Sequence, residues 1–170
     1  MSGITSEDTV SGAVVDYIPA LRSYAWSLTR RWEDVDDLVQ DTLTKAIANA
    51  HRFRTGTNLR AWLMTIMRNT FLNQIAKSSR ERTGAAECVS SIPTVPGTQE
   101  WYIRGNEMMA AITLLPAHYR EMLILVVMLG ESYQSAADIC GVAVGTVKSR
   151  VNRARALVLE QMGETTFEDG

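Results

Sequence analysis

The stretch that decides the fold is SYQSAADICGVAVGTVKSRVNRARAL, residues 132–157. Gly141 separates two helical segments, because glycine adopts the left-handed backbone of a tight turn most easily. Small side chains at Ala136 and Ala137 allow the second segment to cross the first closely. In the second segment apolar residues recur every three or four positions, at Val144, Val147, Val151, Ala154 and Val158. This spacing places them on one helical face toward a core, so the stretch predicts a helix-turn-helix.

The opposite face of the second segment is polar. At about 100° per residue it centres on Ser149, Asn152 and Arg153, with Lys148 and Thr146 on its flanks. Hydroxyl, amide and guanidinium groups on one helix face can read base edges and hold phosphates in a major groove. An ordinary helical hairpin with a basic solvent face would have a similar pattern. The absence of acidic residues between positions 139 and 159, together with the turn glycine, favours DNA binding.

The composition of the whole chain argues against several other classes. The 170 residues are 46% hydrophobic and 21% charged, which suits one ordinary domain or two small ones. No apolar run approaches the ~20 residues of a membrane span, and the polar start is unlike a signal peptide. Since the chain has only two cysteines and two histidines, well separated, we expect no disulfide framework, no metal site and no cofactor. These features predict a cytoplasmic protein.

The net charge of −2 conceals an uneven distribution. Residues 42–80 contain seven basic side chains and no acidic one, and residues 139–159 contain four basic side chains and no acidic one. The acids gather at residues 33–41 and 160–169. Two basic blocks indicate two surfaces that face nucleic acid, and the acidic blocks leave room for other partners. The alternative is that the charge runs are simply solvated faces.

The remainder of the chain also reads as helix, with sparse glycine and proline and no strand-like alternation. Helical spacing of apolar residues predicts helices over residues 17–32, 36–50, 58–71, 101–116 and 122–129. Asp36 and Asp37 stand where acids suit a helix start, and Asn58 is suited to cap the third helix. We therefore predict an all-α fold.

The segment around residues 81–100 has a different composition, with Gly, Ser and Pro and few large apolar side chains. It predicts a flexible linker between two small helical domains. The predicted boundaries are a first domain at 1–82, the linker at 83–100, a second domain at 101–163 and an acidic tail at 164–170. Because so polar a linker cannot hold a large apolar interface, we expect the two domains to be separate units.

Two segments resemble a known family. VGTVKSRVNRAR (144–155) closely resembles the region-4 recognition helix of extracytoplasmic-function (ECF) RNA polymerase sigma factors. DDLVQDTLTKAIANAHRFRTGTNLRAWLMTIMRNTFLN (36–73) looks like region 2 of the same family, and the order of the two segments also matches. LPAHYREMLILV (115–126) and residues 136–155 look most like the general-stress-response, EcfG-like group, in which Ala136 often replaces a commoner Ile. The resemblance covers nearly the whole chain outside the linker and the two ends.

The resemblance implies that region 2 binds a coiled coil on the largest subunits of core RNA polymerase. The matching positions are Asp37, Leu38, Gln40 and Asp41. From the residues alone, Asp37 and Asp41 lie one turn apart on one helix face and suit a basic partner. Helix capping would account for Asp37 but leaves Asp41 unexplained.

The resemblance also implies that region 2 opens the promoter −10 element and that region 4 reads the −35 element. A single strand is held by stacking and basic groups, and the loop at residues 51–58 offers Phe53 for stacking and Arg52 and Arg54 for phosphates. Further −10 candidates are Thr57, Asn58, Asn69 and Asn73, and the −35 candidates are Thr146, Lys148, Ser149, Asn152 and Arg153. Trp62 and Phe71 follow the apolar stripe and are expected in the core.

The overall prediction is an alternative sigma factor for a stress response, not an enzyme, because no catalytic constellation occurs in the sequence. Its expected partners are core RNA polymerase, promoter DNA and a small NepR-like anti-sigma factor. The anti-sigma factor is expected to cover the polymerase face of region 2 and part of region 4, where Met122 or Met128 could be exposed. Two alternatives remain open: a decoy that sequesters an anti-sigma protein, and a stand-alone helix-turn-helix repressor.

Overall fold

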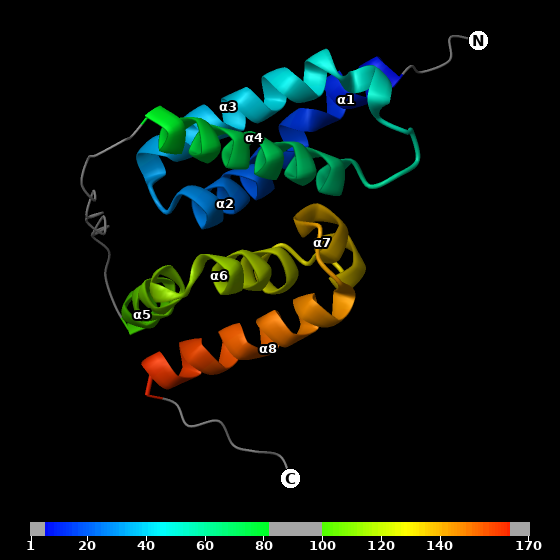
Figure 1. Ribbon diagram of the computed structural model, residues 1–170. Coiled ribbons are helices and arrows are strands. Elements are labelled where there is room, and N and C mark those ends of the chain that lie inside the picture. The colour runs from blue at the N-terminus through cyan, green and yellow to red at the C-terminus, as the bar shows by residue number, and fades with distance from the viewer. Residues whose placement is uncertain (1–5, 82–99, 164–170) are drawn as a thin grey trace.

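The structure is a computed structural model that describes residues 6–81 and 100–163, and every regular element in these two ranges is helical (Figure 1). The N-terminal half contains α1 (Ser6–Ala13), η1 (Val14–Tyr17), α2 (Ile18–Thr29), α3 (Trp32–Ala48), η2 (Ala50–Arg52) and α4 (Leu59–Glu81). The C-terminal half contains α5 (Glu100–Leu114), α6 (Ala117–Leu123), η3 (Ile124–Met128), α7 (Tyr133–Cys140) and α8 (Val144–Gln161). The predicted all-α class is confirmed for these ranges. Nearly all of the predicted linker and the whole acidic tail lie outside the described residues.

Local sequence signals explain several helix ends. The Asn58 side chain caps α4, with its Oδ1 accepting a hydrogen bond from the Ala61 N–H at 3.0 Å, as predicted. Ser132 caps α7 in the same way through the Ser135 N–H at 3.0 Å. Gly141 ends α7 with φ +64°, the left-handed conformation expected of the turn glycine.

Two helices differ from the sequence prediction. Helix α3 begins at Trp32, four residues before Asp36, so Glu33 and Asp34 occupy its first turn and interact with the positive end of the helix dipole. The apolar stretch 122–129 is not one α-helix, because α6 passes at Ile124 into a π-helical turn, η3. There the Leu129 N–H donates to the Ile124 carbonyl at 2.9 Å, a five-residue step that rotates the following chain relative to an α-helix.

Helices α2, α3 and α4 pack on one another in the N-terminal half, and α6 and α7 each pack on α8 in the C-terminal half. Fully buried side chains fill both groups of helices: Leu21, Tyr24, Val35, Leu63 and Met67 in the first, and Leu125, Val147, Val151 and Ala154 in the second. Trp62 and Phe71 are half-buried and pack against this core, in line with the prediction.

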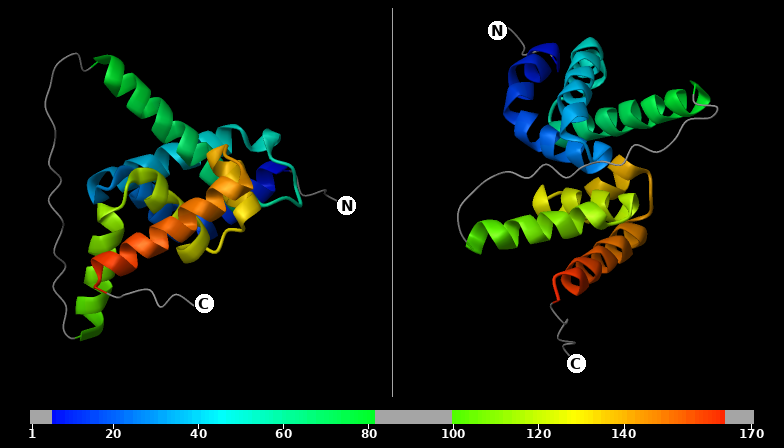
Figure 2. Two further views of the ribbon diagram at one scale, coloured as in Figure 1. Left: turned by 60° about the horizontal axis from the view of Figure 1, so that its bottom comes forward. Right: turned by 90° about the vertical axis from the view of Figure 1, so that its left-hand side faces the viewer.

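The two halves pack directly against each other. Figure 1 shows α1–α4 as one layer and α5–α8 as another, and the right-hand view of Figure 2 shows the same two layers from the side. Helix α4 contacts α7, and α2 contacts α6 and η3. The buried apolar side chains of both halves form one cluster. The helices themselves supply these contacts, and the two halves correspond to the two small helical domains that the sequence predicts.

Candidate functional site

The predicted recognition helix is α8. Its buried side chains are Val147, Val151, Ala154 and Val158, and Val144, predicted on the same stripe, is 38% exposed. Lys148, Ser149, Asn152 and Arg153 are exposed, and Thr146 is half-buried. Helix α8 packs on α5, α6 and α7 and lies farther from the N-terminal half than α6 does (Figures 1 and 2). Its polar face is therefore available to a duplex.

The segment from the end of η2 to α4 has two exposed arginines on either side of a buried aromatic residue. Arg52 and Arg54 are exposed, as expected of phosphate contacts. Phe53 between them is only 4% exposed, and its ring lies 5.3 Å from the Trp62 ring, centroid to centroid. The side chain predicted to stack on a base is thus part of the core. Burying its apolar surface against Trp62 stabilises the loop, which leaves the two arginines held outward.

The remaining −10 candidates are exposed and lie in the same loop and on α4. The Thr57 hydroxyl donates to the Arg54 carbonyl at 2.7 Å, and Asn58 caps α4, so both side chains shape the loop. Asn69 and Asn73 are one helical turn apart on α4, and both are exposed. The structure thus places the four polar side chains on one loop-and-helix unit.

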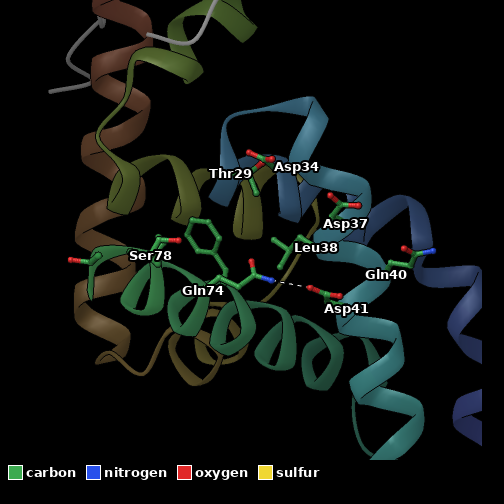
Figure 3. Close-up of a pocket in the computed structure, with 11 residues that line it drawn as sticks. Thr29, Asp34, Asp37, Leu38, Gln40, Asp41, Gln74 and Ser78 are labelled. Atoms are coloured by element: carbon green, nitrogen blue, oxygen red, sulfur yellow. Dashed lines mark hydrogen bonds between the residues drawn. The ribbon is translucent and has the colours of Figure 1, made fainter. Parts of the chain in front are cut away.

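A groove of about 670 Å³ lies between α3 and the C-terminal part of α4 (Figure 3). One wall carries the carboxylates of Asp34, Asp37 and Asp41, and the other carries Phe71, Ile75, Ser78 and Ser79. The Gln74 amide reaches from α4 and donates to Asp41 Oδ2 at 2.9 Å. An acidic wall facing a partly apolar wall suits an amphipathic helix with basic side chains.

Of the predicted polymerase contacts, Asp37, Gln40 and Asp41 are exposed and line this groove. Leu38 also lines it, but only 2% of its surface is exposed. Its side chain belongs to the core between α3 and α4 and can offer little area to a partner. Leu38 therefore stays a predicted contact, but its side chain is buried where it lines the groove.

Sequence reasoning missed a group of charged residues between the two halves. Glu121 accepts hydrogen bonds from the Tyr24 hydroxyl at 2.7 Å and from Arg68 Nε at 2.8 Å. Burial raises the pKa of Tyr24 well above its usual value, and the negative charge of Glu121 adds to the shift. Arg120 is 1% exposed, and burial lowers its pKa to about 10. A signal was available in the sequence, because Arg120 and Glu121 directly precede the apolar stretch 122–129.

Comparison with known proteins identifies the family. Residues 13–81 match the model of Sigma-70 region 2, and residues 105–158 match that of Sigma-70, region 4. The chain is 45% identical over 150 residues to the ECF RNA polymerase sigma factor EcfG of Rhodopseudomonas palustris, covering 88% of this chain and 82% of that one. It is 33% identical over 154 residues to the ECF RNA polymerase sigma factor SigC of Mycobacterium tuberculosis, covering 86% and 82%.

Among solved structures, the sigma factor RpoE of Bartonella quintana, determined in complex with the anti-sigma factor NepR, superposes with a TM-score of 0.75. It is 40% identical, and the match covers 92% of this chain and 98% of that one. None of the described helices is both long and apolar enough to cross a membrane. On the sequence matches and the shared arrangement of helices, the chain belongs to the ECF family of RNA polymerase sigma factors.

Proposed function

We propose that this protein is an alternative sigma factor that binds core RNA polymerase, directs it to specific stress-response promoters and is held inactive by an anti-sigma factor. The observation that carries the proposal is the free polar face of α8, on which Ser149, Asn152 and Arg153 are exposed opposite a buried apolar stripe. The protein would act in the cytoplasm by binding alone and would leave the chemistry of RNA synthesis to the polymerase.

The work is divided among three surfaces. The α8 face reads the −35 element, with Thr146, Lys148, Ser149, Asn152 and Arg153 as its contacts. The loop and α4 hold the −10 strand, with Arg52 and Arg54 on phosphates and Thr57, Asn58, Asn69 and Asn73 on bases or sugars. The acidic groove between α3 and α4 receives the polymerase, through Asp37, Gln40 and Asp41.

A small NepR-like protein is the proposed inhibitor, since the RpoE relative was determined in complex with NepR. It would cover the acidic groove and part of the C-terminal half. Met122 is fully buried and cannot take part, but Met128 is 47% exposed, and Val127 beside it is 46% exposed. An apolar inhibitor helix would find flexible methionine surface there.

The proposal is tested by run-off transcription with purified core polymerase and a pool of genomic promoter fragments. We expect promoter-specific transcripts only when this protein is present, and lower yield from the Arg153→Ala variant. Arg155→Ala is the matched control, because Arg155 is exposed on α8 but lies nearer the buried stripe. Tight promoter binding without polymerase would instead identify a repressor. Binding of an anti-sigma protein with no transcription would identify a decoy.

A further inference from the structure

Two buried carboxylates of the C-terminal half find their cationic partners in the N-terminal half. Glu121 on α6 binds Arg68 of α4 and the Tyr24 hydroxyl of α2, and its side chain is 9% exposed. Glu131, between η3 and α7, binds Arg60 of α4 with Nε and Oε1 2.6 Å apart, and its side chain is 2% exposed. We call these five residues the interdomain latch.

Backbone contacts on the same interface reinforce the latch. Arg120 Nε donates to the Ser27 carbonyl in α2 at 2.9 Å, while its Nη1 donates to the Leu115 carbonyl at 2.9 Å within its own half. Arg30 Nη2, following α2, donates to the Thr113 carbonyl of α5 at 2.7 Å. Within the described residues, no buried side-chain polar atom lacks a hydrogen-bond partner. The buried polar side chains of the closed interface thus all have hydrogen-bond partners.

An interface of this composition can open. When the halves separate, the latch carboxylates and arginines return to water, and the hydration that they regain nearly offsets the attraction that they lose. A purely apolar interface of similar size would have no such compensation. These polar contacts therefore specify one closed arrangement and add little net free energy to it, while the apolar cluster shared by the two halves supplies the stabilisation that opening must overcome.

The closed arrangement conflicts with binding to a whole promoter. The −10 and −35 elements lie about 25 base pairs apart, which is ~85 Å of duplex at roughly 3.4 Å per base pair. A compact chain of this length has a diameter of about 40 Å. The −10 surface on the N-terminal half and α8 on the C-terminal half cannot reach both elements while the halves remain packed together.

The closed arrangement also matches that of an inhibited relative. The superposition on RpoE from its complex with NepR covers 92% of this chain at a TM-score of 0.75, so it includes both halves in a similar relative placement. Neither half alone could account for such coverage. The closed arrangement of this chain is therefore similar to that of the inhibitor-bound relative.

We propose that the interdomain latch is an autoinhibitory contact: it holds the sigma factor closed, and binding to polymerase and promoter requires Glu121 and Glu131 to release Arg68 and Arg60. This inference rests on the proposed function for its consequence, promoter engagement. It also makes a claim about the free protein that can be tested without DNA or polymerase. Breaking the latch should open the molecule and raise its affinity for core polymerase.

The test compares latch variants with matched controls in the full-length chain. Glu121→Gln and Arg68→Gln each remove one charge from the latch, and Tyr24→Phe removes only one hydrogen bond. Glu107→Gln on α5 and Arg22→Gln on α2 make the same changes at exposed positions, and the ion-pair partner of Arg22, Asp36, lies in its own half. Circular dichroism checks that each variant keeps its helix content.

Two readouts report opening directly. Small-angle X-ray scattering gives the radius of gyration, and a Cys88→Ser background leaves Cys140 as the single thiol for labelling. Cys140 is buried at the end of α7, which packs on α4, so labelling requires opening. Burial and the charge of Glu121 raise the pKa of this thiol and the charge of Arg68 lowers it, so faster labelling counts as opening only where Arg68→Gln also shows it. We expect Glu121→Gln and Arg68→Gln to enlarge the radius of gyration and to label at least tenfold faster. Tyr24→Phe should label two- to tenfold faster, and both controls should stay within twofold of the parent.

The equilibrium between closed and open molecules determines how much a latch variant gains in affinity for core polymerase. If only open molecules bind core polymerase, a latch variant gains affinity by no more than the factor by which its closed-to-open ratio falls. The latch proposal would be wrong if folded Glu121→Gln and Arg68→Gln variants kept the radius of gyration and the labelling rate of the parent. It would also be wrong if the two control variants changed as much as the latch variants. Should Glu121→Gln lose its helix content, Tyr24→Phe decides by the same labelling criterion. If the latch variants label faster but neither they nor the parent produce transcripts, the proposed function is rejected and the latch is retained.

Discussion

Arg153 and Lys148 are both exposed cations on α8, but they stand at different distances from the centre of its polar face. A guanidinium near the centre can bond guanine bidentately, whereas an ammonium on the flank meets a phosphate as a point charge. We expect Arg153→Ala to cost roughly 1–3 kcal/mol at the preferred promoter and to relax the preference at one −35 base pair. Lys148→Ala should weaken all sequences about equally and lower the salt slope by roughly one unit.

Transcription and binding by holoenzyme across a −35 substitution library, at several salt concentrations, separate the two roles. Ser149→Ala and Asn152→Ala should lie between these extremes. A uniform loss at every promoter in Arg153→Ala would identify Arg153 as a phosphate clamp and would require the helix to be rotated in the groove.

Phe53 offers a second test at the level of one residue, because the structure assigns to the core a ring that the sequence suggested for base stacking. Phe53→Leu keeps most of the buried volume but removes the aromatic face. We expect promoter opening to be largely retained, with a modest fall in melting temperature from the lost contact with Trp62. Permanganate footprinting of the −10 region measures the opening. A variant that is stable but cannot open the promoter would restore the stacking role.

At the scale of the element, one asparagine both begins α4 and belongs to the −10 loop. Loss of the hydrogen bond between Asn58 and the Ala61 N–H in Asn58→Ala should destabilise the fold by about 1 kcal/mol. It should also lower transcription by changing the loop that carries Arg54. Asn73→Ala, at an exposed position inside α4, should lower transcription without loss of stability. Urea unfolding and run-off assays together distinguish capping from DNA contact, and equal stabilities of the two variants would contradict the cap.

At the scale of the whole molecule, the continuous apolar cluster predicts that the two halves unfold together. Differential scanning calorimetry of the parent chain should give one transition with equal calorimetric and van 't Hoff enthalpies. Glu131→Gln, which breaks the contact with Arg60, should broaden or split that transition. Two resolved transitions in the parent would show that the halves fold independently and that the interface contributes little to stability.

What the sequence alone determined is local in origin. Helical spacing predicted the all-α class and the buried stripe of α8, Gly141 marked the turn, and Asn58 marked the start of α4. These signals depend on residues within a few positions of one another, and backbone geometry makes them periodic. The exposed basic residues proposed to contact DNA could also be predicted from the sequence, because their place on a helix face follows from the same local spacing.

Only the tertiary structure decided which side chains meet across the chain. Tyr24 and Glu121 are 97 positions apart, and Arg68 and Glu121 are 53 apart, so no spacing rule connects them. The burial of Phe53 against Trp62 and of Leu38 between α3 and α4 likewise depends on how helices pack. The type of a residue indicates whether its surroundings must be apolar or must supply an opposite charge. Which residue becomes its partner depends on how distant helices pack. Contacts between segments far apart in sequence leave no pattern in the local sequence.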